Sequence, residues 1–464
     1  MQENWTRRDL LKSLGLASLG LSVTQLTAAR LNERQYFFHY DGDLPKPAGK
    51  ITAIVAGAGN RGNVYGGYAL KHPDVLDIVG VAEPIEIRRS RFTEKHGIDP
   101  DKAFYTWEEI FERPKFADAV IITTPDKLHY GPAMKALAMG YDLLLEKPIA
   151  QSWKECKDIL DLAEKNGRIV AVCHVLRYSP YYRKIRETIE NGDLGELVSV
   201  QHMEPIQHEH MSHSYVRGNW RREEDNVPIL LAKSCHDLDI LRWWLDRNCE
   251  YVSSFGSLKW FRAANAPDGA PMRCTDGCPA EAACPYSALK IYYRNRTYLH
   301  HFDLPEDRDL WGDAIMTNLK EGPYGRCVYH CDNDVADHQV VSMQFAGDVT
   351  ANFNMEAFTQ YYGRRTRIMG SMGDLVGDEN DLYFHNFRNG EVTKWNVREN
   401  AEITSGHGGG DYGLMRDFLH AVSKHDSSLL TSTLAASMES HLMGFKAEES
   451  RHTKQVMRVD IRKG

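Results

Sequence analysis

The 464-residue sequence lacks several features that mark common classes of protein. It has no internal repeat and no low-complexity tract, so neither a solenoid nor a disordered chain is expected. Its net charge is −8 and no basic block stands out, so we expect no nucleic-acid partner. An apolar stretch at residues 14–26 is short and contains Gly and Ser, so we expect no stable membrane insertion.

Cysteine is scarce outside one segment. Five of the nine cysteines fall between residues 262 and 335: Cys274, Cys278, Cys284, Cys327 and Cys331. The segment is rich in Cys, Pro, Asn and Arg and shows little periodicity, so we interpret it as an insertion, for example a lid or rim. Its spacings differ from the C-x2-C pattern of zinc ribbons. A structural zinc, one or two disulfides and free thiols therefore stay open as alternatives, and neither of the first two implies catalysis.

Residues 1–29 resemble a twin-arginine export signal. The pair Arg7-Arg8 precedes the apolar stretch, and small residues near Ala29 suit a cleavage site. We therefore expect a periplasmic or otherwise exported protein that crosses the membrane already folded. Residues 30–49 are polar and predict an extended arm before the first strand.

An apolar run at residues 51–56 leads directly into the pattern G-x-G-x-x-G. The first glycine permits a tight turn, the second lets the backbone approach a pyrophosphate, and the third lets the next helix pack closely. This predicts a dinucleotide site. Its predicted residues are Gly57, Gly59, Asn60, Arg61 and Gly62.

A second apolar run, at residues 77–82, ends in Glu83, roughly 20 residues beyond the last glycine. A carboxylate at this place suits the ribose hydroxyls of NAD and repels the 2′-phosphate of NADP. We therefore predict NAD as the cofactor. Arg88 and Arg89 follow closely enough to accommodate a phosphate, which keeps NADP as the less favoured alternative.

Strands and helices alternate between residues 50 and 172, which predicts βαβ units on a doubly wound parallel sheet. The predicted strands are 51–56, 77–82, 117–123, 141–145 and 169–173, with helices such as 128–139 and 152–166. About 430 residues follow the signal, too many for one ordinary core, so we expect a second domain.

Residues 173–464 have a different pattern. Apolar residues alternate along 341–345 and, after a Gly-Asp turn, along 349–355, which predicts a hairpin with one buried face. Further strands are predicted at 196–203, 251–260, 365–369 and 381–387, and helices at 235–245, 411–424 and 432–450. The fold class is thus α/β plus α+β, with a predominantly antiparallel open sheet covered by helices in the second domain.

Glu146-Lys147-Pro148 ends a predicted strand at the edge where doubly wound sheets bind ligands. Together, four features resemble the Gfo/Idh/MocA oxidoreductases over nearly the whole chain. They are the glycine pattern, this triplet, the stretch from His174 to Tyr178 and a helix that opens at His236. The resemblance implies that Lys147 points toward the nicotinamide and the substrate hydroxyl, as an acid or hydrogen-bonding partner. It also implies cofactor contacts from Thr124, Pro125, His129, Glu146 and Arg177.

The family's second chemical motif is usually D-x-G-x-H. Here His236 is present, but Ala232 takes the place of the Asp and Lys233 is an added cation. We keep His236 as the candidate general acid or base, with Lys233 as either a helper or a solvent-facing side chain.

The stretch from His407 to Asp411 holds three consecutive glycines. It is either a flexible loop that caps the next helix, or it resembles the His-Gly-Gly loop of exported NAD-dependent sugar enzymes, such as certain α-N-acetylgalactosaminidases. The predicted substrate contacts are Tyr178, Tyr181, His213, Arg217, Trp220, His407 and Asp411.

Together these features predict hydride transfer between a small carbohydrate and a tightly bound NAD, with no catalytic metal. Two alternatives stay open: a redox-neutral NAD-dependent glycoside hydrolase and a non-catalytic sugar-binding protein. Dimers are common in the resembling family, so we expect a homo-oligomer.

Overall fold

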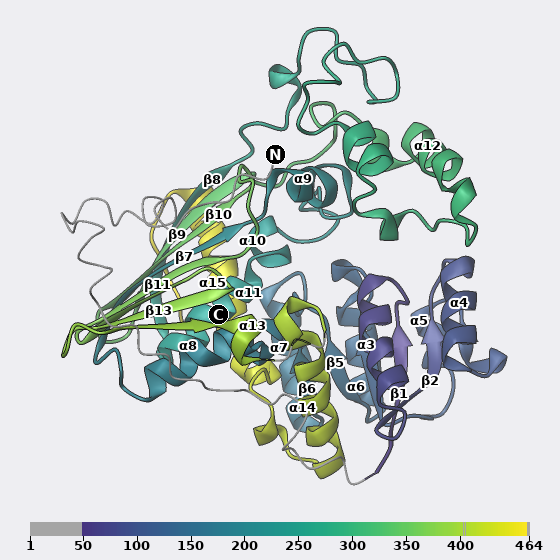
Figure 1. The fold of residues 1–464 in the computed structure, drawn as a ribbon. Coiled ribbons are helices and arrows are strands. Elements are labelled where there is room, and N and C mark those ends of the chain that lie inside the picture. Colours follow the sequence, from purple (N-terminus) through teal and green to yellow (C-terminus); the bar gives the residue numbers. More distant parts are fainter. Residues whose placement is uncertain (1–48, 402, 404, 462–464) are drawn as a thin grey trace.

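A computed structural model describes residues 49–461 except 402 and 404, and it forms two sheets with their helices (Figure 1). The predicted signal and nearly all of the predicted arm lie outside the described residues. Within the described part, no helix is both long enough and apolar enough to cross a membrane.

The first sheet has six parallel strands in the order β3-β2-β1-β4-β5-β6, as a Rossmann domain requires. The strands are β1 (Ile51–Ala56), β2 (Leu76–Ala82), β3 (Ala103–Phe104), β4 (Ala119–Ile122), β5 (Asp142–Leu145) and β6 (Val170–Val172). Every residue of β4, β5 and β6 is buried, because helices cover both faces of the sheet. All five predicted strands are confirmed to within a few residues.

Helices connect these strands (Figure 1). They include α3 (Asn60–Lys71), α4 (Glu86–His96), α6 (Tyr130–Ala138) and α7 (Trp153–Lys165). Helix α7 begins at a capping box, in which the Ser152 hydroxyl and the Glu155 carboxylate each accept a bond from the other residue's amide.

The second sheet has nine strands in the order β14-β13-β12-β11-β7-β10-β9-β8-β15. Its strands are β7 (Leu197–Pro205), β8 (Cys249–Ser257), β9 (His338–Phe345), β10 (Val349–Glu356), β11 (Arg365–Gly370), β12 (Gly373–Gly377), β13 (Asp381–Asn386), β14 (Val392–Asn396) and β15 (Met457–Arg458). All neighbouring pairs are antiparallel except β7 and β10. The predicted fold class is confirmed.

One face of this sheet packs against α8 (Pro180–Glu190), α11 (Cys235–Leu245) and α15 (Leu434–Thr453). The predicted hairpin is β9–β10, in which Val341, Phe345 and Phe353 are completely buried. On the opposite face, Phe255 and Val340 are exposed neighbours.

Helix α14 (Gly410–Lys424) belongs to the part of the chain that we assigned to the second domain, but it packs on the first. Its apolar side, including Leu414 and Phe418, joins the core that holds Ile51 and Val55 of β1. The Rossmann core is therefore completed by a segment from the far end of the chain, which local periodicity alone does not reveal.

The Cys-rich insertion is more regular than its sequence suggests. It contains a π-helical turn at Leu289–Arg294 and helix α12 (Trp311–Glu321), packed on a small core around Tyr292 and Ile315. In Figure 1 this segment lies over the part of the Rossmann domain that holds α3 and α4. It reaches that domain through Asp303, whose carboxylate pairs with Arg88 of α4.

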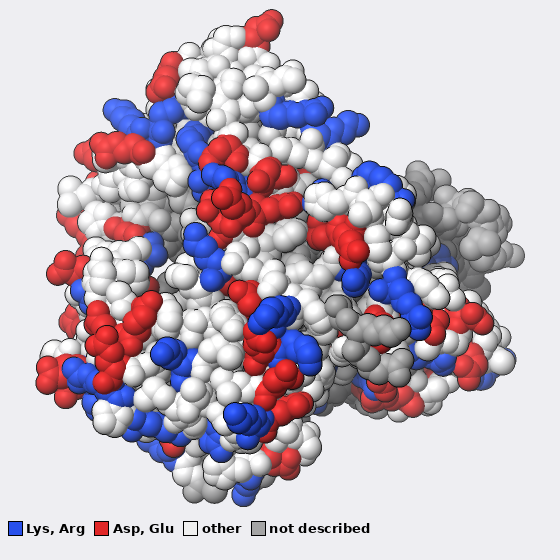
Figure 2. Space-filling model, turned by 180° about the vertical axis from the view of Figure 1, so that it is seen from behind, with Lys and Arg blue, Asp and Glu red and all other residues white. Residues whose placement is uncertain are grey.

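Acidic and basic side chains are interspersed on the face shown in Figure 2, and neither sign forms a continuous field there.

Candidate nucleotide and substrate site

The glycine turn between β1 and α3 has the shape that its pattern predicts. A Cβ on Gly57 would lie 2.7 Å from the Thr123 carbonyl oxygen, and one on Gly62 would lie 2.1 Å from the Gly57 carbonyl oxygen. Gly59, in contrast, has no other heavy atom within 4 Å of that position. At Gly57 and Gly62 a larger residue would therefore clash with the backbone. The space at Gly59 stays open, which suits a pyrophosphate, and α3 begins at the next residue, Asn60.

Glu83 follows β2 and is buried beside this turn. Its carboxylate accepts a hydrogen bond from the Ala58 amide at 2.9 Å and another from the Ile85 amide at 3.0 Å. Of the two nearby arginines, Arg88 is held by Asp303 at 2.8 Å, and Arg89 donates one N–H to the Glu83 carbonyl oxygen. The local charge therefore suits NAD better than NADP.

Arg61 and Glu146, both predicted to contact the cofactor, bond to each other. Arg61 Nε donates to Glu146 Oε1 at 2.6 Å, and Arg61 Nη2 donates to Asp411 Oδ1 at 2.7 Å. Burial by itself would raise the pKa of Glu146, but Arg61 and Lys147 lower it below its usual value. The ionised pairs connect α3, the Glu-Lys-Pro turn and the loop of His407, which are far apart in sequence.

Lys147 stands at the carboxyl end of β5, where a cis peptide bond precedes Pro148. Its Nζ donates to the Ala232 carbonyl oxygen at 2.7 Å. Ala232 occupies the position at which the family pattern has an aspartate. The backbone carbonyl therefore takes the aspartate's place as the partner of Lys147, although a carbonyl cannot accept its proton.

His236, at the start of α11, is buried next to this lysine. Burial first, and then the charge of Lys147, lower its pKa well below the usual value, so its ring is neutral. Its Nδ1 has no hydrogen-bond partner among the described residues. A neutral ring can accept a proton, which keeps His236 as the candidate general base.

Two further imidazoles flank His236. Its ring centroid lies 5.9 Å from that of His174 and 6.1 Å from that of His407. His407 also lies with Nδ1 3.1 Å from Asp411 Oδ1, and its side chain is 41% exposed. The structure thus brings His407 close to His236, while the sugar-enzyme interpretation of its loop stays a prediction. Our prediction gave His174 no role, although it lies within a motif that we recognised.

The loop after β4 is joined to the Glu-Lys-Pro turn by His129. Its buried ring has Nδ1 2.7 Å from the Pro148 carbonyl oxygen and Nε2 3.0 Å from the Thr124 carbonyl oxygen. Thr124 also donates its hydroxyl to the Leu128 carbonyl, and Pro125 precedes the 3-10 turn Asp126–Leu128. His129 therefore positions the two loops and has no free ring nitrogen for a cofactor.

Other predicted contacts are occupied inside the protein. Arg177 is buried and makes two bonds of 2.6 Å to Asp239, with further bonds to Thr431 and Ala436. Lys233 pairs with Glu204 at 3.3 Å, within a buried network of charges. Arg177, predicted to contact the cofactor, and Lys233, predicted as a helper or a solvent-facing lysine, are thus both engaged in ion pairs with carboxylates of the protein.

Most predicted substrate contacts are also internal. The Tyr178 hydroxyl lies 2.9 Å from Ser432 Oγ, and Tyr181 is buried in the core of the second domain. Trp220 donates to Asp126 Oδ2 at 3.1 Å. His213 and Arg217 are buried against the Cys-rich insertion. These residues thus have partners inside the protein, and their contact with a substrate stays a prediction.

All nine cysteines have free thiols, so none of the disulfides left open by the sequence is formed. Within residues 49–461, apart from the two left out, no three His, Cys, Asp or Glu side chains are arranged to hold a metal ion. The structure therefore does not support the hypothesis of a zinc ion.

A parallel sheet with this glycine turn, followed by a mixed sheet on the same chain, defines a two-domain nucleotide-dependent dehydrogenase fold. The model of the oxidoreductase family's NAD-binding Rossmann fold matches residues 51–174, and that of its C-terminal alpha/beta domain matches residues 186–460. The chain therefore belongs to the Gfo/Idh/MocA oxidoreductase family.

Similar proteins include YteT of Bacillus subtilis, named as an oxidoreductase, which is 26% identical over 65% of this chain and 71% of its own. The NAD-dependent scyllo-inositol 2-dehydrogenase of B. subtilis is 26% identical over 45% of this chain and 58% of its own. A levoglucosan dehydrogenase solved with NADH and levoglucosan superimposes with a TM-score of 0.66 at 15% identity, over 89% of this chain and 100% of its own. At that identity the likeness shows the fold.

Proposed function

We propose that this protein oxidises or reduces a carbohydrate by hydride transfer with a tightly bound NAD. One observation supports this above the others: Lys147 and a neutral His236 with an unused nitrogen meet where the Rossmann strands end. Relatives named for scyllo-inositol, 1,5-anhydro-D-fructose and levoglucosan act on polyols and sugars, which supports the substrate class.

The residues at the Rossmann edge fit NAD. The open space at Gly59 suits the pyrophosphate, and Glu83 brings a carboxylate to the side where the adenosine ribose would lie. When bound, NAD would supply the hydride acceptor. The chain's own residues handle the proton: His236 takes it from the substrate hydroxyl while Lys147 Nζ holds the oxygen.

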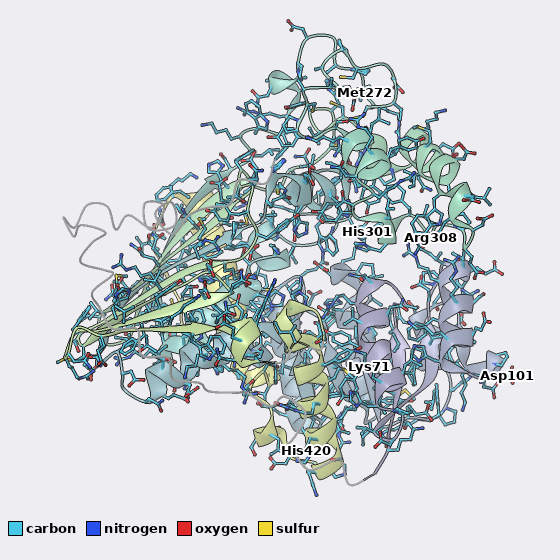
Figure 3. The ribbon with its side chains drawn as sticks, viewed as in Figure 1. Lys71, Asp101, Met272, His301, Arg308 and His420 are labelled. Atoms are coloured by element: carbon cyan, nitrogen blue, oxygen red, sulfur yellow. The ribbon has the colours of Figure 1, made fainter. Side chains whose placement is uncertain are left out.

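Tight retention of the cofactor is supported by the insertion. The Arg88–Asp303 pair and a bond of 3.2 Å from Arg91 Nη2 to the Leu304 carbonyl tie the insertion to α4. Figure 3 places His301 and Arg308 on the border of the insertion that faces α3 and α4. A segment held in this position slows the escape of a nucleotide from the glycine turn.

A redox-neutral glycosidase is the second candidate, and the His407 loop favours it. In that cycle a sugar hydroxyl is oxidised, the neighbouring C–H loses a proton, the glycosidic bond is eliminated, water adds and the hydride returns, so no external oxidant is consumed. His407, near His236 and partly exposed, is placed to move the second proton. This cycle also suits an exported protein, which meets no soluble NAD pool, and we retain export as part of the proposal.

The open face of the second sheet supports a homo-oligomer, because Phe255 and Val340 lie exposed and adjacent there. Light scattering of the purified protein tests this. A monomer at all concentrations would contradict it.

The function is tested on protein purified with its nucleotide. Sugars, polyols and glycosides are screened by absorbance at about 340 nm, which reports reduced nicotinamide. Many product molecules per bound NAD without an added acceptor indicate the hydrolase. A single turnover indicates the dehydrogenase. Loss of the signal in Lys147→Met but not in Lys157→Met, a substitution of an exposed lysine of α7 that forms a long ion pair, links the chemistry to the site. Absence of any signal over the whole panel contradicts an enzyme and favours a sugar-binding protein.

A further inference from the structure

His174 is a buried imidazole whose two ring nitrogens both lack a hydrogen-bond partner among the described residues. It stands two residues after β6, at the edge of the Rossmann sheet where Lys147 ends β5, and it is 1% exposed. Buried polar atoms in folded proteins are paired with protein or with ordered water, so a ring with two unused nitrogens requires an explanation.

The two imidazoles beside His174 differ in their bonding. His441 of α15, with its ring centroid 5.4 Å away, is satisfied: its Nδ1 lies 3.0 Å from the Ser437 carbonyl oxygen, and its Nε2 accepts the Ile149 amide at 3.0 Å. His236 of α11, with its centroid 5.9 Å away, is not satisfied, because its Nδ1 is buried without a partner in the described chain. Three unused nitrogens therefore lie on two neighbouring rings.

The charged groups around His174 determine its protonation. Its Nε2 lies 3.6 Å from Asp239 Oδ1 of α11, a carboxylate that Arg177 holds with two bonds of 2.6 Å. Burial first, and then the charges of Arg177 and Lys147, lower the pKa of His174 well below its usual value, while Glu146 acts in the opposite direction. The ring is therefore neutral. The nearby carboxylate favours the proton on Nε2, which leaves Nδ1 as an acceptor.

A water molecule between the two rings would satisfy both of them, since a buried water needs two or more polar partners. We propose that His174 is a positioning residue for His236: one buried water accepts the Nδ1 proton of His236 and donates to Nδ1 of His174. This inference rests on the proposed function of His236 as the general base.

The bridge would act on His236 in two ways. It holds the proton of the neutral ring on Nδ1 and leaves Nε2 to take the proton of the substrate hydroxyl. It also stabilises the imidazolium that then forms, because the acceptor is oriented by His174 and, behind that ring, by Asp239. The two histidines and the carboxylate thus supply the orientation that an aspartate at position 232 does not provide in this chain.

The substitution His174→Phe keeps a flat ring and removes both nitrogens. We expect kcat to fall by about 10- to 100-fold, while KM for the carbohydrate and the retention of NAD stay at wild-type values. His174→Asn, which can still donate and accept, should recover part of the loss. The matched control is His420→Phe, because His420 also has an unpartnered Nδ1 but lies on α14 far from the site (Figure 3). An unchanged kcat in His174→Phe overturns the proposal.

The pH profile separates this role from a loss of packing. The titratable or charged groups that face His236 are Lys147, His174, His407 and Arg364. Without the bridged acceptor, the protonated ring is less stable, so the acid limb of kcat/KM should move to lower pH in His174→Phe. A loosened core would instead admit water and relieve the burial of His236. The limb would then move to higher pH, which would contradict the proposal.

Crystals of the full-length protein with NAD bound test the contact without any turnover. We expect one ordered water within hydrogen-bonding distance of Nδ1 of both His174 and His236. Absence of that water at high resolution, or a bond from NAD to either nitrogen, overturns the proposal even if a variant does not fold. A wild-type protein that is inactive on every substrate contradicts the proposed function, whereas the crystal decides the contact between the two histidines independently.

Discussion

Loosening the insertion from the nucleotide-binding domain should speed the release of NAD. The contact is specific: Arg88 Nε and Nη2 each donate to one carboxylate oxygen of Asp303 at 2.8 Å. Asp303→Asn removes the charge and retains the shape of the side chain. Asp303 has a φ of 46°, in the left-handed region that Asn also tolerates, so the substitution adds no backbone strain.

The expected size follows from the exposure of the pair. The side chains of Arg88 and Asp303 are 29% and 33% exposed, so solvent screens their attraction, while the two parallel bonds strengthen it. Such a pair stabilises the contact by about 0.5–1 kcal/mol. If release requires the contact to open, the rate of NAD release should rise about 2- to 5-fold, and less at high salt.

The release rate is measured by diluting protein that retains NAD into excess NADH and following the change in NADH fluorescence as NADH replaces the released NAD. Asp158→Asn is the matched control, because Asp158 pairs with Lys154 at 2.6 Å on the surface of α7, which does not touch the insertion. Release from the control should match the wild type. If Asp303→Asn releases NAD at the wild-type rate in low salt, the insertion does not hold the cofactor.

Three further predictions concern the site itself. Gly62→Ala should lower both the unfolding temperature and NAD retention, because its Cβ would meet the Gly57 oxygen at 2.1 Å; Gly59→Ala should keep the unfolding temperature and lose only NAD affinity. His236→Gln should reduce kcat by about 10²- to 10⁴-fold while NAD stays bound. In the wild type, kcat/KM should fall on the acid side only below the lowered pKa of His236, where its ring becomes protonated. Burial alone would raise the pKa of Asp411, but its contacts with His407 and Arg61 hold that pKa below the usual value. The ionised carboxylate therefore stabilises the fold above about pH 4 and loses this effect as the pH falls. In Asp411→Asn, the unfolding temperature should depend less on pH in the acid range.

The sequence predicted the elements whose pattern is local. Buried parallel strands such as β4 and β5 are continuous apolar runs, and the hairpin β9–β10 alternates strictly, so both are recognisable. Strand β12 was missed: its sequence begins and ends in glycine, and only its neighbours in the sheet make it a strand. The share of α14 in the Rossmann core was missed for the same reason, since it depends on contacts distant in sequence.

In the candidate site, too, features with a local motif were predicted and contacts between residues distant in sequence were not. The glycine turn, Lys147 and His236 were identified from short motifs, each carrying its own chemistry. The partners of these residues were not, because Lys147 meets a carbonyl 85 positions away and Arg61 meets Asp411 350 positions away. Tyr178 and Tyr181 were assigned to the substrate because a polyol needs aromatic contacts. The structure shows both side chains buried, and sequence alone does not separate a core aromatic from a sugar contact.

The contact between Lys147 and the Ala232 carbonyl constrains how a proton leaves this site. An aspartate at position 232 could take a proton from Lys147, whereas a carbonyl can only accept a hydrogen bond. In the reaction proposed above, the proton removed from a substrate would then depart through His236, whose neighbour on the exposed side is His407. His407 in turn is held by Asp411, and Asp411 by Arg61 of the nucleotide-binding helix. If the proposed reaction holds, we therefore expect the exchange of one carboxylate for a backbone oxygen to shift proton transfer toward the His407 loop. This loop contacts the Rossmann domain through the bond between Asp411 and Arg61.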